Sequence, residues 1–132
     1  MKYLLDTNIC IYFLKGQFNL IDKFNNVGIE NFSISEITLA ELIYGAENSL
    51  HPKKNTDIVD KFVDLVSILP VFNSIRLYGK EKAKLRKQGK LISDLDLFIG
   101  TTAVTNNLIL VTRNTKEFER INDIKIENWI DN

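Results

Sequence analysis

The sequence predicts an α/β protein in which three layers, α/β/α, are built around a mostly parallel central sheet of four to five strands. Short apolar segments alternate with segments whose apolar residues recur at helical spacing, which is typical of parallel strands joined by helices. The segment 108–112 is apolar without a break, as expected of a strand covered on both faces. The length of 132 residues and the hydrophobic content of 45% predict one domain over 1–132.

The first half of the chain is expected to contain three strands and four helices. A strand at 2–6 ends in good N-cap residues, and a short helix at 9–14 stops at Gly16. Helical spacing predicts a helix over 18–27, ended by Gly28, and alternation predicts a strand at 32–35. A helix capped by Ser35 or Thr38 follows, then a polar loop at 51–55, a helix around 58–66 and a strand at 68–72. Pro70 places this last strand at a sheet edge or at its own end.

The second half is expected to alternate more regularly. Gly89 ends a helix predicted at 74–88, and a further helix is predicted at 94–106. The apolar strand at 108–112 follows. A short helix at 114–121 and a final strand at 124–130 complete the predicted order.

Three carboxylates stand where a hydrophobic segment gives way to a helical one, namely Asp6, Glu41 and Asp96. Thr112 and Asn114 follow a strand in the same way, and ligands of parallel sheets bind beyond the carboxyl ends of strands. Two carboxylates about 4 Å apart repel each other by about 4 kcal/mol at an effective dielectric of about 20. A helix N-terminus offsets only ~0.3–1 kcal/mol of this repulsion for each carboxylate. Converging acids therefore predict a bound cation, Mg²⁺ or Mn²⁺ before Zn²⁺.

Each acid also has a purely structural interpretation. Asp6 fits a helix N-cap, and capping boxes would account for Glu41 with Thr38 and for Asp96 with Ser93. The apolar residues around all three acids favour a cation site over helix capping, because buried acids rarely lack a partner.

Charge and cysteine content restrict the class of protein. Basic and acidic residues both number 17, so net charge indicates no partner, but six bases and one acid in 80–90 give a local net charge of 6 − 1 = +5. This segment is either a solvated helix or a weak phosphate-binding surface in which Lys82 and Arg86 would take part. His51 is the only histidine, which argues against a histidine-based site. Cys10 is the only cysteine, so no intrachain disulfide can form and a cytoplasmic protein is predicted. Its side chain is expected to be buried. No segment resembles a signal peptide or a membrane span.

Five segments together resemble PIN domains, and most closely the VapC-type toxins of prokaryotic toxin–antitoxin pairs. They are LLDTNI at 4–9, SEITLAELIYG at 35–45, DLDLFIG at 94–100, LVTRNTKEF at 110–118 and ENW at 127–129. The resemblance covers nearly the whole chain with the segments in the expected order.

The resemblance implies an Mg²⁺- or Mn²⁺-dependent endoribonuclease that cuts structured RNA such as tRNA or rRNA. It also implies a homodimer and a small antitoxin partner, whose basic side chain would enter the acidic pocket. Carried over by position, Asp6, Glu41 and Asp96 match the acidic centre, with Asp6 and Asp96 as the clearest metal ligands. The supporting polar positions are Asn8, Thr112 and Asn114.

Two positions depart from the pattern of the family. Many relatives have an aspartate where this chain has Asn114, so Glu117 would supply the fourth acid or the fourth acid would be absent. Asp94 stands where relatives have a neutral residue, either as a surface cap or as a further charge of the site.

The expected chemistry is hydrolysis by water that Glu41 orients or deprotonates, while a metal on Asp6 and Asp96 activates the water and the phosphate. Water attack would leave a 5′-phosphate and a 3′-hydroxyl. A catalytically silent PIN-like domain that binds RNA or protein is the alternative, and a purely structural interaction domain would leave the acids unexplained. An Asp-nucleophile phosphatase is disfavoured, because Asn8 stands where that class needs a second aspartate.

Overall fold

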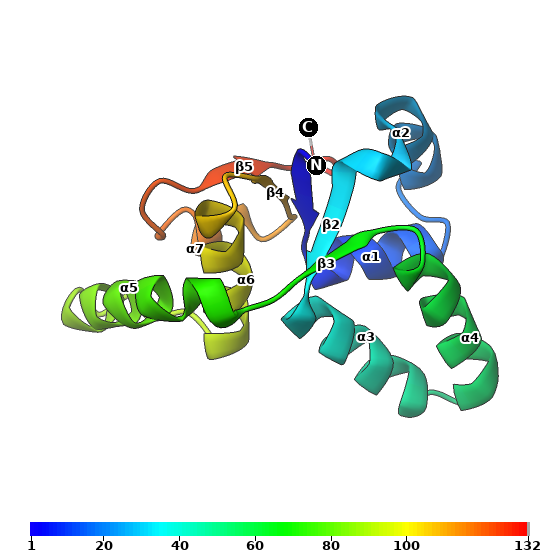
Figure 1. Ribbon diagram of the computed structural model, residues 1–132, viewed down its shortest axis with the longest axis horizontal. Helices are drawn as coiled ribbons and strands as arrows, with labels where there is room; N and C mark the ends of the chain where they lie inside the picture. Colours follow the sequence, from blue (N-terminus) through cyan, green and yellow to red (C-terminus); the bar gives the residue numbers. More distant parts are fainter. Residues whose placement is uncertain (132) are drawn as a thin grey trace.

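A computed structural model describes residues 1–131 and contains one five-stranded sheet (Figure 1). The strand order is β3-β2-β1-β4-β5, and all neighbouring strands pair in parallel. The strands are short: β1 Tyr3–Leu5, β2 Phe32–Ser35, β3 Ser67–Leu69, β4 Ile109–Val111 and β5 Lys125–Glu127. The predicted fold class, with a parallel sheet of four to five strands, is confirmed.

Seven α-helices and two 3₁₀-helices are described within residues 1–131. They are α1 Thr7–Leu14, α2 Leu20–Val27, η1 Ile29–Asn31, α3 Glu36–Glu47, α4 Pro52–Val63, η2 Phe72–Ser74, α5 Ile75–Lys87, α6 Asp94–Thr105 and α7 Thr115–Phe118. None of the helices in this part of the chain combines the length and the apolar character needed to cross a bilayer.

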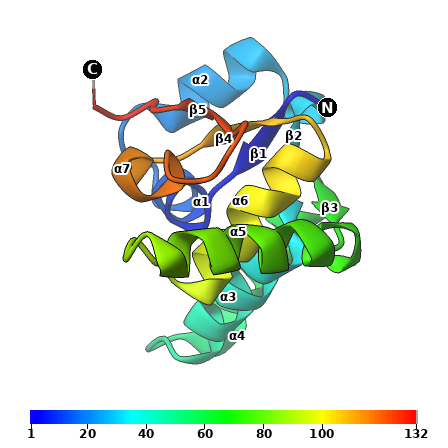
Figure 2. The same cartoon turned by 90° about the vertical axis from the view of Figure 1, so that its left-hand side faces the viewer.

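The central strand explains the three layers, because its side chains alternate between two hydrophobic clusters. Tyr3 and Leu5 belong to one cluster together with residues of α1 to α4, whereas Leu4 belongs to the other with residues of α5, α6 and α7. Figures 1 and 2 show these two groups of helices on opposite sides of the sheet. Leu4 and Leu5 have no exposed surface, as expected of a strand covered on both faces.

Aromatic rings form the centre of the α1–α4 cluster. The ring of Phe24 stacks on that of Phe13 at 4.3 Å and lies 4.4 Å from that of Phe32, measured between centroids. Trp129, after the last strand, packs edge-on against Tyr3 at 5.1 Å. The C-terminal segment therefore closes the core that begins at the first strand.

Two sequence expectations are wrong in detail. The segment 51–55 is not a loop, because α4 begins at Pro52; proline suits the first helical position, where its missing N–H would be unpaired anyway. The strand predicted at 68–72 is β3 at Ser67–Leu69, and Phe72 instead begins η2. Of the two caps predicted for α3, Ser35 is the one observed, because its hydroxyl accepts from the Thr38 N–H at 3.1 Å. Pro70 follows β3, which is an edge strand as predicted.

The turn between α1 and α2 contains unusual backbone. Phe18 and Asn19 both have φ of 57°, in the left-handed region that disfavours residues other than glycine by about 1–2 kcal/mol each. Phe18 nevertheless remains 44% exposed. Burial of its own ring does not account for this conformation.

Candidate active site

Asp6 lies at the carboxyl end of the central strand and begins α1. Its backbone N–H donates to the Val111 carbonyl oxygen at 3.0 Å, which ties it to the end of β4. Its Oδ1 accepts from the Thr7 N–H at 2.8 Å and so caps the helix. The N-cap interpretation is therefore correct, and it leaves Oδ2 directed to other partners.

Thr112 holds the second oxygen of Asp6. The Thr112 hydroxyl donates to Asp6 Oδ2 at 2.8 Å and accepts from the Asn114 N–H at 3.0 Å. Thr112 has no exposed surface. One buried hydroxyl thus connects the ends of two neighbouring strands, β1 and β4.

Glu41 approaches the same place from the second turn of α3. Its Oε1 accepts from the Thr7 hydroxyl at 2.7 Å, and that hydroxyl lies 3.0 Å from the hydroxyl of Thr38. Glu41 is part-buried and lies six residues beyond the Ser35 cap. A capping role for Glu41 is therefore excluded, and its carboxylate lies next to the residue that follows Asp6.

Asp96 enters from the first turn of α6. Its N–H donates to the Ser93 hydroxyl at 3.2 Å, so Ser93 caps this helix as expected. Burial raises the pKa of Asp96, and the charges of Glu41 and Glu117 raise it further, against a lowering by its hydrogen bond with Ser93. The charges of Glu41 and Glu117 thus act on Asp96, and those of Asp96 and Glu41 act on Asp6.

Asn114 and Glu117 form one unit after β4. The Asn114 side-chain N–H donates to Glu117 Oε2 at 3.2 Å, across the start of α7. Glu117 raises the pKa of Asp96, so its charge reaches the site. Both members of the pair adjoin the acids, with Asn114 bound to Glu117.

The other predicted residues lie around this centre. Asn8 is exposed in the first turn of α1. Lys82 Nζ binds Asp94 Oδ1 at 2.8 Å, and the Tyr78 hydroxyl donates to the same oxygen at 2.9 Å. Hydrogen bonds from Lys82 and Tyr78 lower the pKa of Asp94. Asp94 is thus paired with α5, while Arg86 is exposed on the same helix.

Burial raises the pKa of Asp6 to about 6, and the charges of Asp96 and Glu41 add to the rise, while the hydrogen bonds from Thr112 and Thr7 oppose it. Across residues 1–131, no cationic side chain contributes to the shifts of Asp6 or Asp96. A buried carboxylate beside other acids is stabilised by a divalent cation.

The donors at this place are carboxylate, hydroxyl and amide oxygens, which suit a hard ion such as Mg²⁺ or Mn²⁺. In the described part of the chain no three His, Cys, Asp or Glu side chains already converge tightly enough to hold an ion. The nearest partners of Asp6 and Glu41 are instead the threonine hydroxyls. The donor chemistry of these residues suits a divalent ion, for which Asp6, Asp96 and Glu41 are the candidate ligands.

The raised pKa of Asp6 predicts that, in metal-free buffer, the protein is more stable at mildly acidic pH than at neutral pH. The folded state binds a proton that the unfolded state releases between pH about 4 and 6, so the free energy of unfolding falls as pH rises through this window. The melting temperature measured with EDTA should therefore increase from pH 7.5 to pH 5. A shift from 3.8 to about 6 corresponds to at most about 3 kcal/mol.

The matched variant for this prediction is Asp6→Asn, because asparagine caps a helix as well as aspartate does. It should raise the melting temperature at pH 7.5 and flatten the profile between pH 7.5 and 5. A profile that keeps its slope in Asp6→Asn would assign the titration to another group.

Sequence reasoning missed the Thr7 hydroxyl, which donates to Glu41, and the Thr38 hydroxyl, which lies within hydrogen-bond distance of that of Thr7. Thr7 directly follows Asp6, and Thr38 precedes Glu41 by one helical turn. The only available signal was this adjacency, which equally suits helix capping.

Comparison with known proteins gives consistent results. A family model described as PIN domain matches residues 3–124. A protein of Haemophilus influenzae named Ribonuclease VapC2 is 41% identical, over 98% of this chain and 99% of its own. A protein of Shigella flexneri named tRNA(fMet)-specific endonuclease VapC is 36% identical, with 98% of each chain covered. A crystal structure of DNA-bound VapBC from Salmonella typhimurium has a TM-score of 0.91 at 37% identity, covering 98% of both chains.

Proposed function

This chain belongs to the PIN-domain family, and from that premise we propose that it is a metal-dependent endoribonuclease, the toxin of a type II toxin–antitoxin pair. Relatives named as VapC ribonucleases match it over nearly the full length at 36–41% identity. The observation that carries the proposal is Asp6, a buried carboxylate with a pKa of about 6 among three further acids. Such an arrangement suits phosphodiester hydrolysis with a divalent cation.

The roles follow from position. Asp6 and Asp96 would hold the ion, and Glu41 would accept the proton of the attacking water, with the Thr7 hydroxyl keeping the Glu41 carboxylate in place. A divalent ion bound there supplies a Lewis acid that acidifies water and offsets phosphate charge. As the new P–O bond forms, the 3′ oxygen leaves and takes up a proton, so the products carry a 5′-phosphate and a 3′-hydroxyl. Thr112 and Asn114 position Asp6 and Glu117.

We propose structured RNA, tRNA or rRNA, as the substrate class. The relative from Shigella flexneri is named for tRNA(fMet). Lys82 and Arg86 on α5 offer weak phosphate contacts, with Lys82 held at the start of α6 by Asp94.

The deciding experiment incubates the purified chain with total tRNA and with rRNA in Mg²⁺ or Mn²⁺, with and without EDTA. Cleavage with either ion, its loss with EDTA, and 5′-phosphate ends on the fragments are expected. RNA binding without any cleavage under all these conditions would instead favour the catalytically silent domain.

An apolar groove supports the antitoxin as partner. It has a volume of about 420 Å³ between α1, α3 and α4, and its lining includes Ile11, Leu14, Leu42, Ile58 and Val59. Glu41 lines the same groove, so the groove leads to the acids. We propose that an apolar antitoxin segment binds there and inserts a basic side chain beside Glu41. Structures of VapBC complexes are among those that match this chain.

Gly45 provides a sharp test of this groove. It lines the groove on α3, and a Cβ added there meets no atom within 4 Å. Gly45→Leu should therefore leave the fold intact and weaken antitoxin binding at least tenfold, measured by calorimetry with the protein encoded next to this gene. The matched control is Gly79→Leu on α5, where an added Cβ is equally free. Equal affinity of both variants would place the antitoxin elsewhere.

The family resemblance also supports a homodimer. Sedimentation of the chain without its antitoxin tests this directly, and a single monomeric species at micromolar concentration would exclude it.

A further inference from the structure

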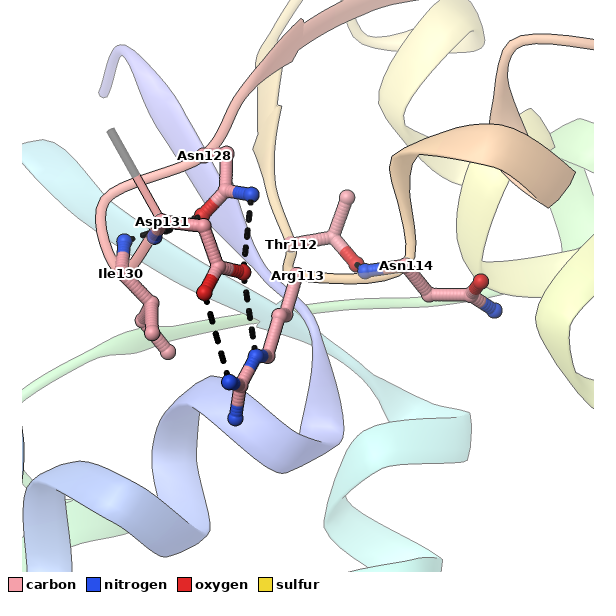
Figure 3. A network of polar contacts seen from close by, with 6 residues as sticks. All are labelled: Thr112, Arg113, Asn114, Asn128, Ile130 and Asp131. Carbon is pink, nitrogen blue, oxygen red and sulfur yellow. Dashed lines mark hydrogen bonds and ion pairs between the residues drawn. The ribbon is translucent and has the colours of Figure 1, made fainter.

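Arg113 stands between the two site residues Thr112 and Asn114 but serves neither of them. Figure 3 shows its side chain directed toward α1, while the side chain of Asn114 points to the opposite side of the loop. The guanidinium carbon of Arg113 lies 5.2 Å from the ring centroid of Phe18 and 6.0 Å from that of Tyr12. Tyr12, Phe18 and Arg113 are called the aromatic–arginine platform below.

The guanidinium of the platform is held in one orientation. Nε and Nη2 of Arg113 both donate to the carboxylate of Asp131, at 3.1 and 3.3 Å (Figure 3). Asn128 fixes Asp131 in turn, because its side-chain oxygen accepts from the N–H groups of Ile130 and Asp131. An ordered guanidinium plane on aromatic rings is a surface suited to a flat ligand.

The platform is open to solvent. Phe18 is 44% exposed and the side chain of Arg113 is 43% exposed. The rings of Tyr12 and Phe18 meet edge-to-face at 4.9 Å, so one ring supports the other. The left-handed backbone of Phe18 and Asn19 presents an aromatic side chain at the surface instead of in the core, where its burial would stabilise the fold.

The platform and the acids share α1, because Asp6 caps the helix that carries Tyr12. Asn8 and Tyr12 are four residues apart and share a helix face, about 6 Å apart along the axis. Asn8 is exposed and follows Asp6 by two residues. This face of α1 therefore leads from the catalytic acids to the rings, and Arg113 joins it from the loop that carries Thr112.

We propose that the aromatic–arginine platform binds an unpaired nucleotide of the RNA next to the cleavage site. The base stacks on the ring of Phe18, and the guanidinium of Arg113 meets a phosphate or the base plane. Exposed aromatic rings with a cationic neighbour are what single-stranded nucleic acid requires, since every base has a π-face and every nucleotide a phosphate. The inference rests on the proposed ribonuclease function.

The test measures binding instead of cleavage, so that it stands apart from the ribonuclease assay. Fluorescence anisotropy gives the Kd of a 5′-fluorescein-labelled single-stranded ten-nucleotide adenosine RNA for the full chain carrying Asp96→Asn. Phe18→Leu retains apolar volume and removes the π-face, and Phe18→Tyr restores the π-face. We expect Phe18→Leu to weaken binding roughly 5- to 150-fold, the range for loss of one stacked base, and Phe18→Tyr to bind like the parent.

Three further variants separate RNA binding from stabilisation of the fold. Phe72→Leu removes another exposed ring, on η2, and should leave the Kd unchanged. Arg113→Gln should weaken binding and reduce the salt slope of log K by roughly 0.7, as expected for one lost phosphate contact with a single strand. Asp131→Asn breaks the same ion pair yet keeps the cation, so it should weaken RNA binding less than Arg113→Gln does and leave the salt slope at the parental value.

Two results would overturn the proposal. One is equal RNA affinity of the parent and Phe18→Leu. If Phe18→Leu then changes only the sedimentation of the chain, Phe18 belongs to a protein–protein contact. The other is an equal loss of affinity in Asp131→Asn and Arg113→Gln, which would assign Arg113 to holding the C-terminal segment. Absence of cleavage by the unsubstituted chain would refute the ribonuclease function and leave these binding constants measurable.

Discussion

Asp96→Asn is expected to reduce the rate of RNA cleavage by roughly 10³-fold or more, because several kcal/mol of charge stabilisation depend on the divalent ion. The half-buried carboxylate of Asp96 carries a raised pKa beside Glu41 and Glu117. Asparagine keeps the shape and removes the charge, so the ion binds weakly. The measurement is single-turnover cleavage in Mg²⁺, together with the rise in melting temperature that Mn²⁺ produces.

The matched control is Asp60→Asn, an exposed aspartate on α4, which should cleave at the parental rate. Asp96→Asn should also lose the stabilisation by Mn²⁺, a result that a merely misfolded variant would not give selectively. Cleavage by Asp96→Asn within a factor of a few of the parental rate would remove Asp96 from the metal-binding residues.

Phe24→Ala is expected to lower the free energy of unfolding by about 3–5 kcal/mol, as observed when a large aromatic side chain is removed from a packed core. Phe24 is 2% exposed, and its ring lies between those of Phe13 and Phe32. Phe13 belongs to α1 and Phe32 to β2, the strand that pairs with β1. The cavity would therefore open beneath the neighbour of the strand that ends at Asp6. Urea unfolding followed by circular dichroism gives the value.

Phe72→Ala serves as the control, because that ring is 77% exposed and surface substitutions usually change stability by less than about 0.5 kcal/mol. The m-values of both variants should match that of the parent, since the same surface unfolds. A loss below about 1 kcal/mol for Phe24→Ala would mean that the aromatic cluster rearranges to fill the space.

The order of strands and helices could be predicted from the sequence because parallel sheets leave a strong pattern. The strands β1 and β4 read as short apolar runs and β2 alternates, and the helix caps Asp6, Ser35 and Ser93 are residues with a known preference for that position. Pro52 was misinterpreted, because proline marks a loop and the first turn of a helix equally well.

The site was predictable in its residue types and less so in its contacts. Acids at strand ends indicate a common edge, but which hydroxyl reaches which carboxylate depends on side-chain rotamers that the sequence does not encode locally. Thr7 illustrates this, since its hydroxyl bonds to Glu41 on another helix. The pairing of Arg113 with Asp131 joins residues on two loops, and neither loop has a periodicity that would reveal it.

The central position of β1 determines when activity can arise during synthesis. The strand that ends at Asp6 pairs with β4, whose residues follow more than 100 positions later in the chain. Until β4 and α7 have emerged, Thr112 and Glu117 are not in place, and no nascent fragment contains the complete catalytic centre. Assembly of the site is therefore expected to be a late event in the synthesis of these residues.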